Sequence, residues 1–108
     1  MAKVDITRFR GDTDPLVFTF SKNKVALDIT GSTFTLSVST EQSPTVALYI
    51  LQLSGVVTTP LLGVVEFTPS AIQADFIGSY FYDIEMVSGS VVKTVVSGKF
   101  KMLQDITK

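Results

Sequence analysis

The sequence predicts an all-β protein, an antiparallel β-sandwich of about eight strands with one short helical turn. Valine, threonine and phenylalanine are abundant, and branched and aromatic side chains suit a pleated, half-buried strand. Apolar and polar residues alternate with a period of two; Phe34, Leu36 and Val38, for example, share one face of a strand. Turn-forming residues interrupt this alternation at short intervals. At this length we expect a single domain, residues 1–108.

In the first half of the chain, short polar segments separate the expected strands. A turn at residues 10–15 ends in Pro15, which lacks the N–H that a sheet requires. Residues 21–24 form a polar hairpin turn, and Pro44 lies in the segment that ends the fourth strand. The expected strands are residues 3–8, 16–20, 25–29 and 33–40.

The second half begins with a strand at residues 45–53, whose consecutive apolar residues suggest that both faces avoid water. We expect a loop at 55–60. Thr68 as N-cap and Pro69 at the first helical position predict one turn of helix over residues 70–75. Gly98 is expected to mark a β-bulge. The remaining expected strands are residues 62–68, 79–87, 91–96 and 99–103.

The end of the helical turn matches a corner found in immunoglobulin-like sandwiches. There, the hydroxyl of a tyrosine that follows the corner bonds back to the corner backbone. We assign this corner to Asp75, Gly78 and Tyr80. Tyr82 then takes the place of a cysteine of antibody domains, so an aromatic ring would fill the disulfide position. Alternatively, Tyr80 and Tyr82 are ordinary aromatic residues at the edge of the core.

The composition argues against several functions. The chain has no histidine and no cysteine, so imidazole proton transfer, disulfides and thiolate zinc sites are excluded, and we expect no cofactor or metal. The net charge is −1 and the basic residues are scattered, which argues against nucleic-acid binding. Asp5 and Arg8 lie where a signal peptide needs an apolar core, and no apolar run could span a membrane. We expect synthesis in the cytoplasm without a signal peptide.

Three polar motifs also have a structural explanation. Asp12 and Asp14 begin an Asp-x-Asp pattern, but no glutamate follows at the spacing of a calcium loop. Asp83 and Glu85 share a strand face, as glycosidase carboxylates can, yet a solvent-facing strand accounts for both. Residues 10–12 spell the Arg-Gly-Asp adhesion tripeptide, which is a weak match that a tight turn also explains. We therefore expect no enzymatic activity.

A long uncharged stretch is the most informative feature for function. None of the residues between Glu41 and Glu66 is charged, whereas soluble domains normally interrupt apolar strands with lysine or glutamate. The stretch could be a central hairpin buried on both faces. We favour a hairpin whose outer face packs against another copy or another protein. The predicted interface residues are Tyr49, Leu51, Leu53, Val57, Leu61 and Leu62.

The order of the motifs resembles the N-terminal domain of the phage and prophage baseplate upper protein family. The matching segments are residues 6–7, 10–13, 16–20, 25–31, 34–38, 65–68, 78–84 and 97–100. This resemblance implies an immunoglobulin-like domain of a tail-tip organelle. Family members usually continue into a linker and further domains, so a chain ending at Lys108 suggests a small adaptor or an excised domain. The 56–62 segment is also more apolar than the resemblance implies.

Together these features predict a non-enzymatic structural protein of a tailed-phage or prophage virion. It would form homo-oligomers and dock to tail, baseplate or fibre proteins through an apolar β-surface. The alternative is a carbohydrate-binding or host-adhesion module. Sugar sites favour exposed aromatic rings, however, and this chain has no tryptophan and three tyrosines. A capsid-decorating role belongs to the same structural class.

Overall fold

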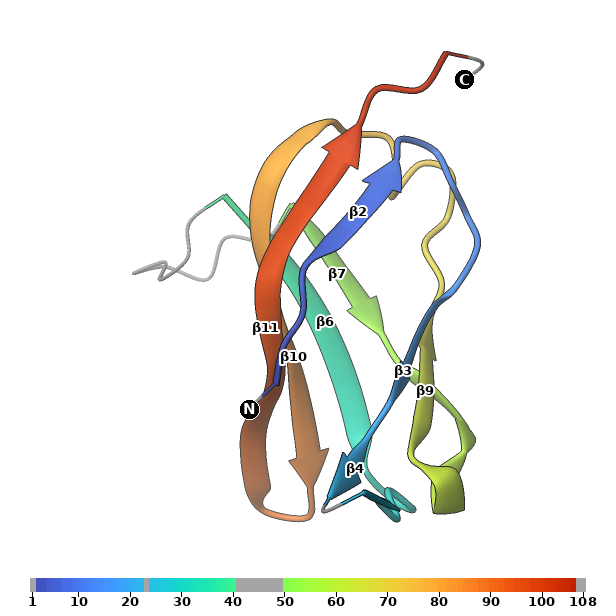
Figure 1. The fold of residues 1–108 in the computed structure, drawn as a ribbon, viewed down its shortest axis with the longest axis vertical. Coiled ribbons are helices and arrows are strands. Elements are labelled where there is room, and N and C mark those ends of the chain that lie inside the picture. The colour runs from blue at the N-terminus through green and yellow to red at the C-terminus, as the bar shows by residue number, and fades with distance from the viewer. Residues whose placement is uncertain (1, 23, 41–49, 107–108) are drawn as a thin grey trace.

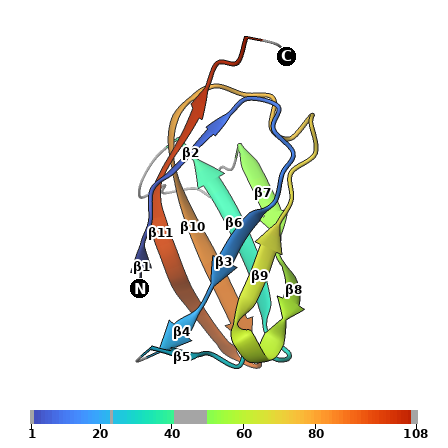
Figure 2. The same ribbon diagram turned by 45° about the vertical axis from the view of Figure 1, so that its right-hand side comes forward.

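The computed structural model describes residues 2–22, 24–40 and 50–106, which form a β-sandwich of two sheets (Figures 1 and 2). The larger sheet has the order β1-β11-β10-β6-β7, with β2 also paired to β11. Its strands are β1 (Ala2–Lys3), β2 (Ile6–Phe9), β6 (Thr33–Ser39), β7 (Leu51–Ser54), β10 (Gly78–Ser88) and β11 (Val91–Leu103). The predicted all-β class is confirmed.

The smaller sheet has the order β3-β9-β8, and a separate β4-β5 hairpin lies at one end of the sandwich (Figure 2). These strands are β3 (Leu16–Thr19), β4 (Ser21–Lys22), β5 (Val25–Ala26), β8 (Val56–Thr59) and β9 (Val64–Phe67). A 3-10 turn, η1 (Pro60–Leu62), joins β8 to β9. The arrangement is immunoglobulin-like: β11, β10 and β6 correspond to the G, F and C strands, and β3, β9 and β8 to B, E and D.

The core lies between the sheets, where strand alternation directs apolar residues inward. Phe34, Leu36 and Val38 of β6 are buried, as their period-two spacing predicts. The Phe34 ring stacks on Phe20, with centroids 5.3 Å apart. Phe67 of β9 is fully buried in the same core. Each such side chain contributes about 1.5–3 kcal/mol when it leaves water.

The N-terminal segment completes one edge of the larger sheet. Both β1 and β2 run parallel to β11, so the predicted strand at residues 3–8 is split in two. At the break, the Val4 N–H donates to the Ser97 carbonyl over 2.9 Å. The Asp5 carboxylate accepts the Lys99 N–H over 3.0 Å. The Asp5 side chain thus replaces a backbone acceptor where the strand is interrupted.

Gly98 lies opposite this break and does not form the expected bulge. It pairs regularly with Tyr82, and the register shifts instead beyond Ile84 in β10. A Cβ atom at Gly98 would fall on the carbonyl oxygen of Val4. The absence of a side chain therefore allows the N-terminal segment to cross closely over β11. The sequence signals a special glycine here, but the reason is close approach of two backbones.

Two further predictions differ from the structure. Residues 56–59 form strand β8 instead of a loop, because they pair with β9 and extend the smaller sheet. Residues 70–75 contain one helix-like hydrogen bond, from the Ala74 N–H to the Ser70 carbonyl, but no helix. Ser70 caps this turn instead of Thr68. The Ser70 hydroxyl accepts the Gln73 N–H, and the Gln73 side-chain oxygen accepts the Ser70 N–H.

In the described part of the chain, no helix has the length and apolar character to cross a membrane.

Candidate interaction surface

The expected interface residues of β7 belong to the core. Leu51 and Leu53 are 6% and 4% exposed, whereas Gln52 and Ser54 face solvent. The physical reason is that β7 pairs with β6, so its inward face takes part in the sandwich core. The prediction that Leu51 and Leu53 would contact a partner is therefore corrected. Tyr49, also predicted at the interface, lies outside the described residues.

The expected interface residues of β8 and η1 have a different placement. Val57 is half-buried and packs against the core. Leu61 and Leu62 are 69% and 56% exposed. Among the predicted interface residues that the structure describes, therefore, these two leucines are the exposed ones. The exposed part of the predicted interface is therefore the apolar turn η1, which joins β8 to β9.

The backbone holds this turn firmly in place. Pro60 begins it, and its carbonyl accepts the Ile29 N–H over 3.0 Å. Gly63 ends it with a left-handed φ of 72°, and its carbonyl accepts the Phe20 N–H over 2.8 Å. A side chain at Gly63 would also collide with the Phe20 carbonyl. These bonds fix the turn, so Leu61 and Leu62 stay at the surface.

An exposed strand edge adjoins the turn. β8 is the terminal strand of the smaller sheet, and Val56 is exposed beside Glu66 of β9. Its four residues carry neither a charge nor a proline, the features that usually protect an edge from pairing. The edge and the turn together form an uncharged surface.

Other exposed apolar residues at this end escaped the sequence analysis. Val25 of β5 is exposed, and so are Val91 and Val92 at the start of β11. Figure 1 shows η1, the β4-β5 hairpin and the β10-β11 turn at the same end of the sandwich. Val25 lies in a two-residue strand, and Val91 and Val92 lie in the exposed first residues of β11. The topology brings these exposed valines to the same end, so the local sequence around each of them does not predict that they lie together.

The predicted corner contains the expected tyrosine hydrogen bond. The Tyr80 hydroxyl donates to the Ile77 carbonyl over 2.7 Å, and its ring packs edge-on against Phe76. Gly78 has a φ of 130°, and a Cβ there would press on the Tyr80 ring. The Asp75 N–H donates to the Ile72 carbonyl, and the Asp75 carboxylate forms an ion pair with Arg10. Gly78 and Tyr80 thus shape the corner, while Asp75 ties it to another segment.

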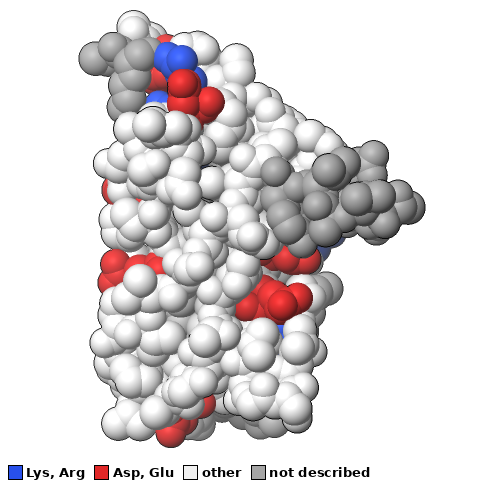
Figure 3. All heavy atoms as spheres, turned by 180° about the vertical axis from the view of Figure 1, so that it is seen from behind, with Lys and Arg blue, Asp and Glu red and all other residues white. Residues whose placement is uncertain are grey.

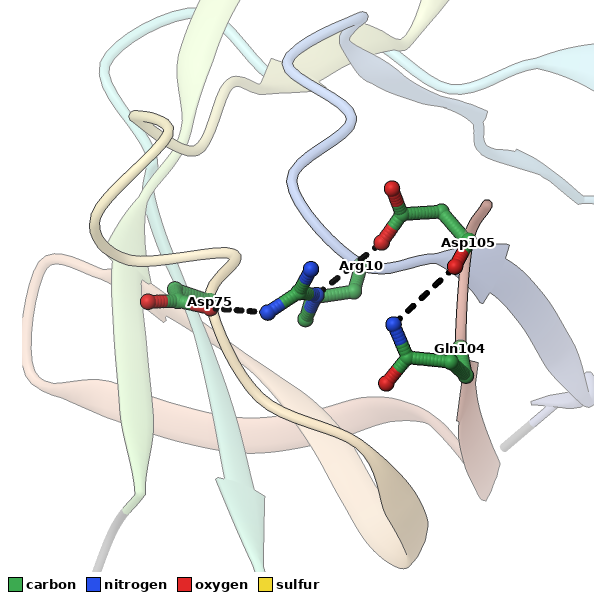
Figure 4. Close-up of polar contacts among 4 residues, drawn as sticks. All are labelled: Arg10, Asp75, Gln104 and Asp105. Atoms are coloured by element: carbon green, nitrogen blue, oxygen red, sulfur yellow. Dashed lines mark hydrogen bonds and ion pairs between the residues drawn. The ribbon is translucent and has the colours of Figure 1, made fainter. Parts of the chain in front are cut away.

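Arg10 connects three separate segments at the opposite end (Figure 4). Its Nε donates to Asp105 over 2.9 Å and its Nη1 to Asp75 over 3.2 Å. Its backbone N–H donates to the Leu103 carbonyl. The hydrogen bond to Asp105, with the charges of both aspartates, raises the pKa of Arg10. Because this guanidinium is engaged inside the chain, the geometry does not favour the adhesion interpretation of residues 10–12.

The carboxylates Asp83 and Glu85 lie on the outer face of β10. Serine and threonine residues of β6 and β11 flank them in the register: Ser37 and Ser97 beside Asp83, Thr35 and Thr94 beside Glu85. Partial burial, with the neighbouring Glu85 charge, raises the pKa of Asp83. The described residues contain no group of three or more acidic side chains that could hold a metal ion. This flat strand face agrees with a solvent-facing role for both carboxylates.

The face viewed from behind in Figure 3 is largely uncharged. Its acidic groups are small and separate, and basic and acidic side chains gather together at the end that holds the C-terminus. Phe9 is the one aromatic residue of the described chain among its exposed large apolar side chains. The described part of the surface therefore offers no aromatic platform of the kind expected for a sugar-binding module.

Comparison with known proteins supports the fold but names no family. No protein-family model and no curated protein matches the sequence. Among solved structures, the N-terminal domain of phage TP901-1 ORF48 aligns with a TM-score of 0.56 and 13% identity. That alignment covers 98% of this chain and 100% of that domain. Membership of the baseplate upper protein family remains a prediction.

Two other solved structures also align with this chain. CopC from Methylosinus trichosporium OB3b aligns with a TM-score of 0.53 and 10% identity, covering 100% of this chain and 90% of that one. The NK cell receptor NKp44 aligns with a TM-score of 0.47 and 14% identity, covering 97% and 99%. At such identities a likeness shows the fold alone. The chain is an immunoglobulin-like β-sandwich that resembles a phage domain over its whole length.

Proposed function

We propose that this protein is a non-enzymatic structural component of a tailed-phage or prophage virion. It docks to a tail, baseplate or fibre protein by burying apolar surface, with no chemical step. Support for the phage setting comes from the end-to-end alignment with the N-terminal domain of phage TP901-1 ORF48 and from the order of the sequence motifs. The observation that carries the docking role is the pair Leu61 and Leu62, held exposed on a rigid turn.

The geometry of the turn suits a docking site. A partner that covers both leucines gains apolar burial without having to order the turn, because the bonds to Phe20 and Ile29 already fix it. The neighbouring edge of β8 offers backbone groups for pairing with an extended strand. The absence of charge from Val56 to Val65 removes the desolvation cost that lysine or glutamate would impose. Truncation of an anchoring leucine is expected to weaken docking by about 2 kcal/mol.

Localisation in the virion tests the proposal. Antibodies raised against the purified chain would be applied to gradient-purified virions of the phage or induced prophage that encodes it, followed by immunogold electron microscopy. We expect label on the tail or its tip, and the chain in the virion by mass spectrometry. Purified virions that contain no chain would refute the structural role. Label confined to the head would instead assign the protein to the capsid.

A further inference from the structure

The N-terminal segment, residues 2–11, is attached along one edge of the larger sheet. Its strands β1 and β2 both run parallel to β11, and Figures 1 and 2 show them beside that strand. Between the two strands, the Val4 N–H donates to the Ser97 carbonyl and the Asp5 carboxylate accepts the Lys99 N–H. Backbone groups of β11 thus hold the segment at its break as well as along both strands.

Few side chains of this segment enter the core. Among residues 3–9, Ile6 packs against the core, whereas Val4, Thr7 and Phe9 are exposed. An edge strand with so little buried apolar surface opens at a free energy below that of global unfolding. The segment can therefore leave β11 while the rest of the sandwich stays folded.

The place that the segment leaves is selective for the segment's own sequence. On opening, the Tyr82 hydroxyl loses the Val4 carbonyl that it binds, and the Lys99 N–H loses the Asp5 carboxylate. Gly98 leaves room for a backbone that crosses closely, because a Cβ there would fall on the Val4 carbonyl oxygen. The vacant edge therefore fits an extended strand with a carboxylate directly after the crossing. The same segment of a second copy meets each of these requirements.

The connection to β3, residues 12–15, is folded back on the segment by Arg8. The Arg8 Nη2 donates to the carbonyls of Asp12 and Asp14 over 3.2 and 2.7 Å, and to the Asp14 carboxylate over 2.9 Å. We call these three bonds the Arg8 clasp. They join the segment to its own connection, so an exchange between molecules breaks them, whereas the bonds to β11 form again with the partner.

We infer that residues 2–11 of one molecule bind β11 of a second copy, and that the second copy returns its own segment to form a reciprocal dimer. The closed and exchanged forms share the bonds to β11, so protein concentration and the Arg8 clasp decide between them. This contact lies on the larger sheet and does not use the apolar turn η1. The inference thus goes beyond the proposed function and does not depend on it.

Cysteine trapping tests the exchange, because the chain has no cysteine of its own. Thr7 of β2 and Lys101 of β11 are register partners, and both are exposed. Thr7→Cys and Lys101→Cys are made in separate chains, which are mixed in equal amounts at high concentration and oxidised in a glutathione redox buffer. An exchanged segment places the two thiols side by side, whereas two closed monomers do not. We expect the mixed disulfide dimer, identified by its intact mass, in excess over its statistical share.

Two controls accompany the trapping. Thr19→Cys on β3 replaces Lys101→Cys and is expected to give no excess, because Thr19 is exposed on the other sheet. A single chain with both Thr7→Cys and Lys101→Cys is oxidised at low concentration, which locks its segment in place. Sedimentation velocity is expected to show this locked chain as a monomer at concentrations where the wild type dimerises. Circular dichroism verifies that each variant is folded.

Two outcomes overturn the exchange. One is a mixed disulfide at no more than its statistical share. The other is a locked chain that dimerises as the wild type does, because its dimer would then form by another route.

Asp14→Ala tests the clasp. The Asp14 side chain is 72% exposed, so its removal is expected to leave the fold intact. Loss of the ion pair with Arg8 is expected to raise the rate of mixed disulfide formation by about twofold to fivefold. Thr13→Ala changes the neighbouring exposed side chain and is expected to leave the rate unchanged. An unchanged rate for Asp14→Ala would refute the role of the clasp.

Discussion

The Tyr82 hydroxyl donates a 2.5 Å hydrogen bond to the carbonyl oxygen of Val4, next to the point where the N-terminal segment crosses Gly98. Tyr82 is buried, and its ring packs edge-on against Phe100, with centroids 6.1 Å apart. In antibody domains a disulfide at this place in the strand joins two strands. In this chain Tyr82 of β10 instead holds the N-terminal segment through Val4.

Tyr82→Phe removes this hydrogen bond and leaves the ring in place. We expect the free energy of unfolding to fall by about 1–3 kcal/mol, because the Val4 carbonyl loses a partner in a partly buried position. Urea denaturation followed by fluorescence measures the change. Tyr80→Phe is the matched control at a more exposed site and is expected to cost less. An unchanged midpoint for Tyr82→Phe would show that the bond contributes nothing to stability.

Tyr82 also predicts a loss of stability at high pH. Burial, with the nearby charge of Asp5, raises the pKa of Tyr82 to about 12 in the folded state, above the ordinary tyrosine value of 10.0. The folded state thus binds this proton more tightly than the unfolded state. Its stabilising contribution, about 2–3 kcal/mol, is fully present below pH 10 and is lost as pH rises through 12. Denaturation curves between pH 8 and about pH 12 measure this decline, which Tyr82→Phe is expected to reduce.

Gly98→Ala is expected to destabilise the protein by about 2 kcal/mol or more, because the new methyl group would overlap the Val4 carbonyl. Gly89→Ala is the control: a Cβ there meets open space, so the cost comes only from its φ of 60°. Thermal unfolding of both variants compares the two effects. Equal, small losses would contradict the close approach at Gly98.

The corrected interface makes opposite predictions for two leucines of the uncharged stretch. Leu53→Ala removes a core side chain and is expected to cost about 2–5 kcal/mol of folding free energy. Leu61→Ala removes an exposed one and is expected to change stability by less than about 0.5 kcal/mol. Chemical denaturation distinguishes them. A large loss for Leu61→Ala would place this leucine in the core.

Arg10→Gln is expected to loosen the end of the sandwich where Arg10 meets Asp75 and Asp105, without unfolding the sandwich. Amide hydrogen exchange in residues 70–77 and 104–106 becomes faster, since the bonds to Asp75 and Asp105 are lost. Arg8→Gln is the control, because Arg8 pairs with Asp14 and leaves those two segments unchanged. Unaltered exchange in the Arg10 variant would mean that the backbone bonds alone hold these segments.

The fold could be predicted from the sequence where the signal is local. The alternation in residues 33–40 places Phe34, Leu36 and Val38 in the core, and the Gly-x-Tyr spacing predicts the bond from Tyr80 to the corner. The interface was harder to predict. Consecutive apolar residues do not reveal which face of a strand meets the opposite sheet, so the sequence pattern does not show that Leu51 and Leu53 point into the core.

Other features depend on contacts between distant segments and leave no local pattern. Pairing with β9 turns residues 56–59 into a strand, although their composition also suits a loop. Gly98 is explained only by Val4, which is far away in the chain. The gathering of Leu61, Val25 and Val91 at one end likewise requires the topology.

The parallel pairing of β2 with β11 has a consequence for biosynthesis. Its register joins Ile6 to Phe100, so nearly the whole chain separates the two partners. Until β11 emerges from the ribosome, β2 lacks the strand with which it pairs in the larger sheet. Its backbone N–H and C=O groups stay hydrated during translation, and the larger sheet is completed only after synthesis of its final strand.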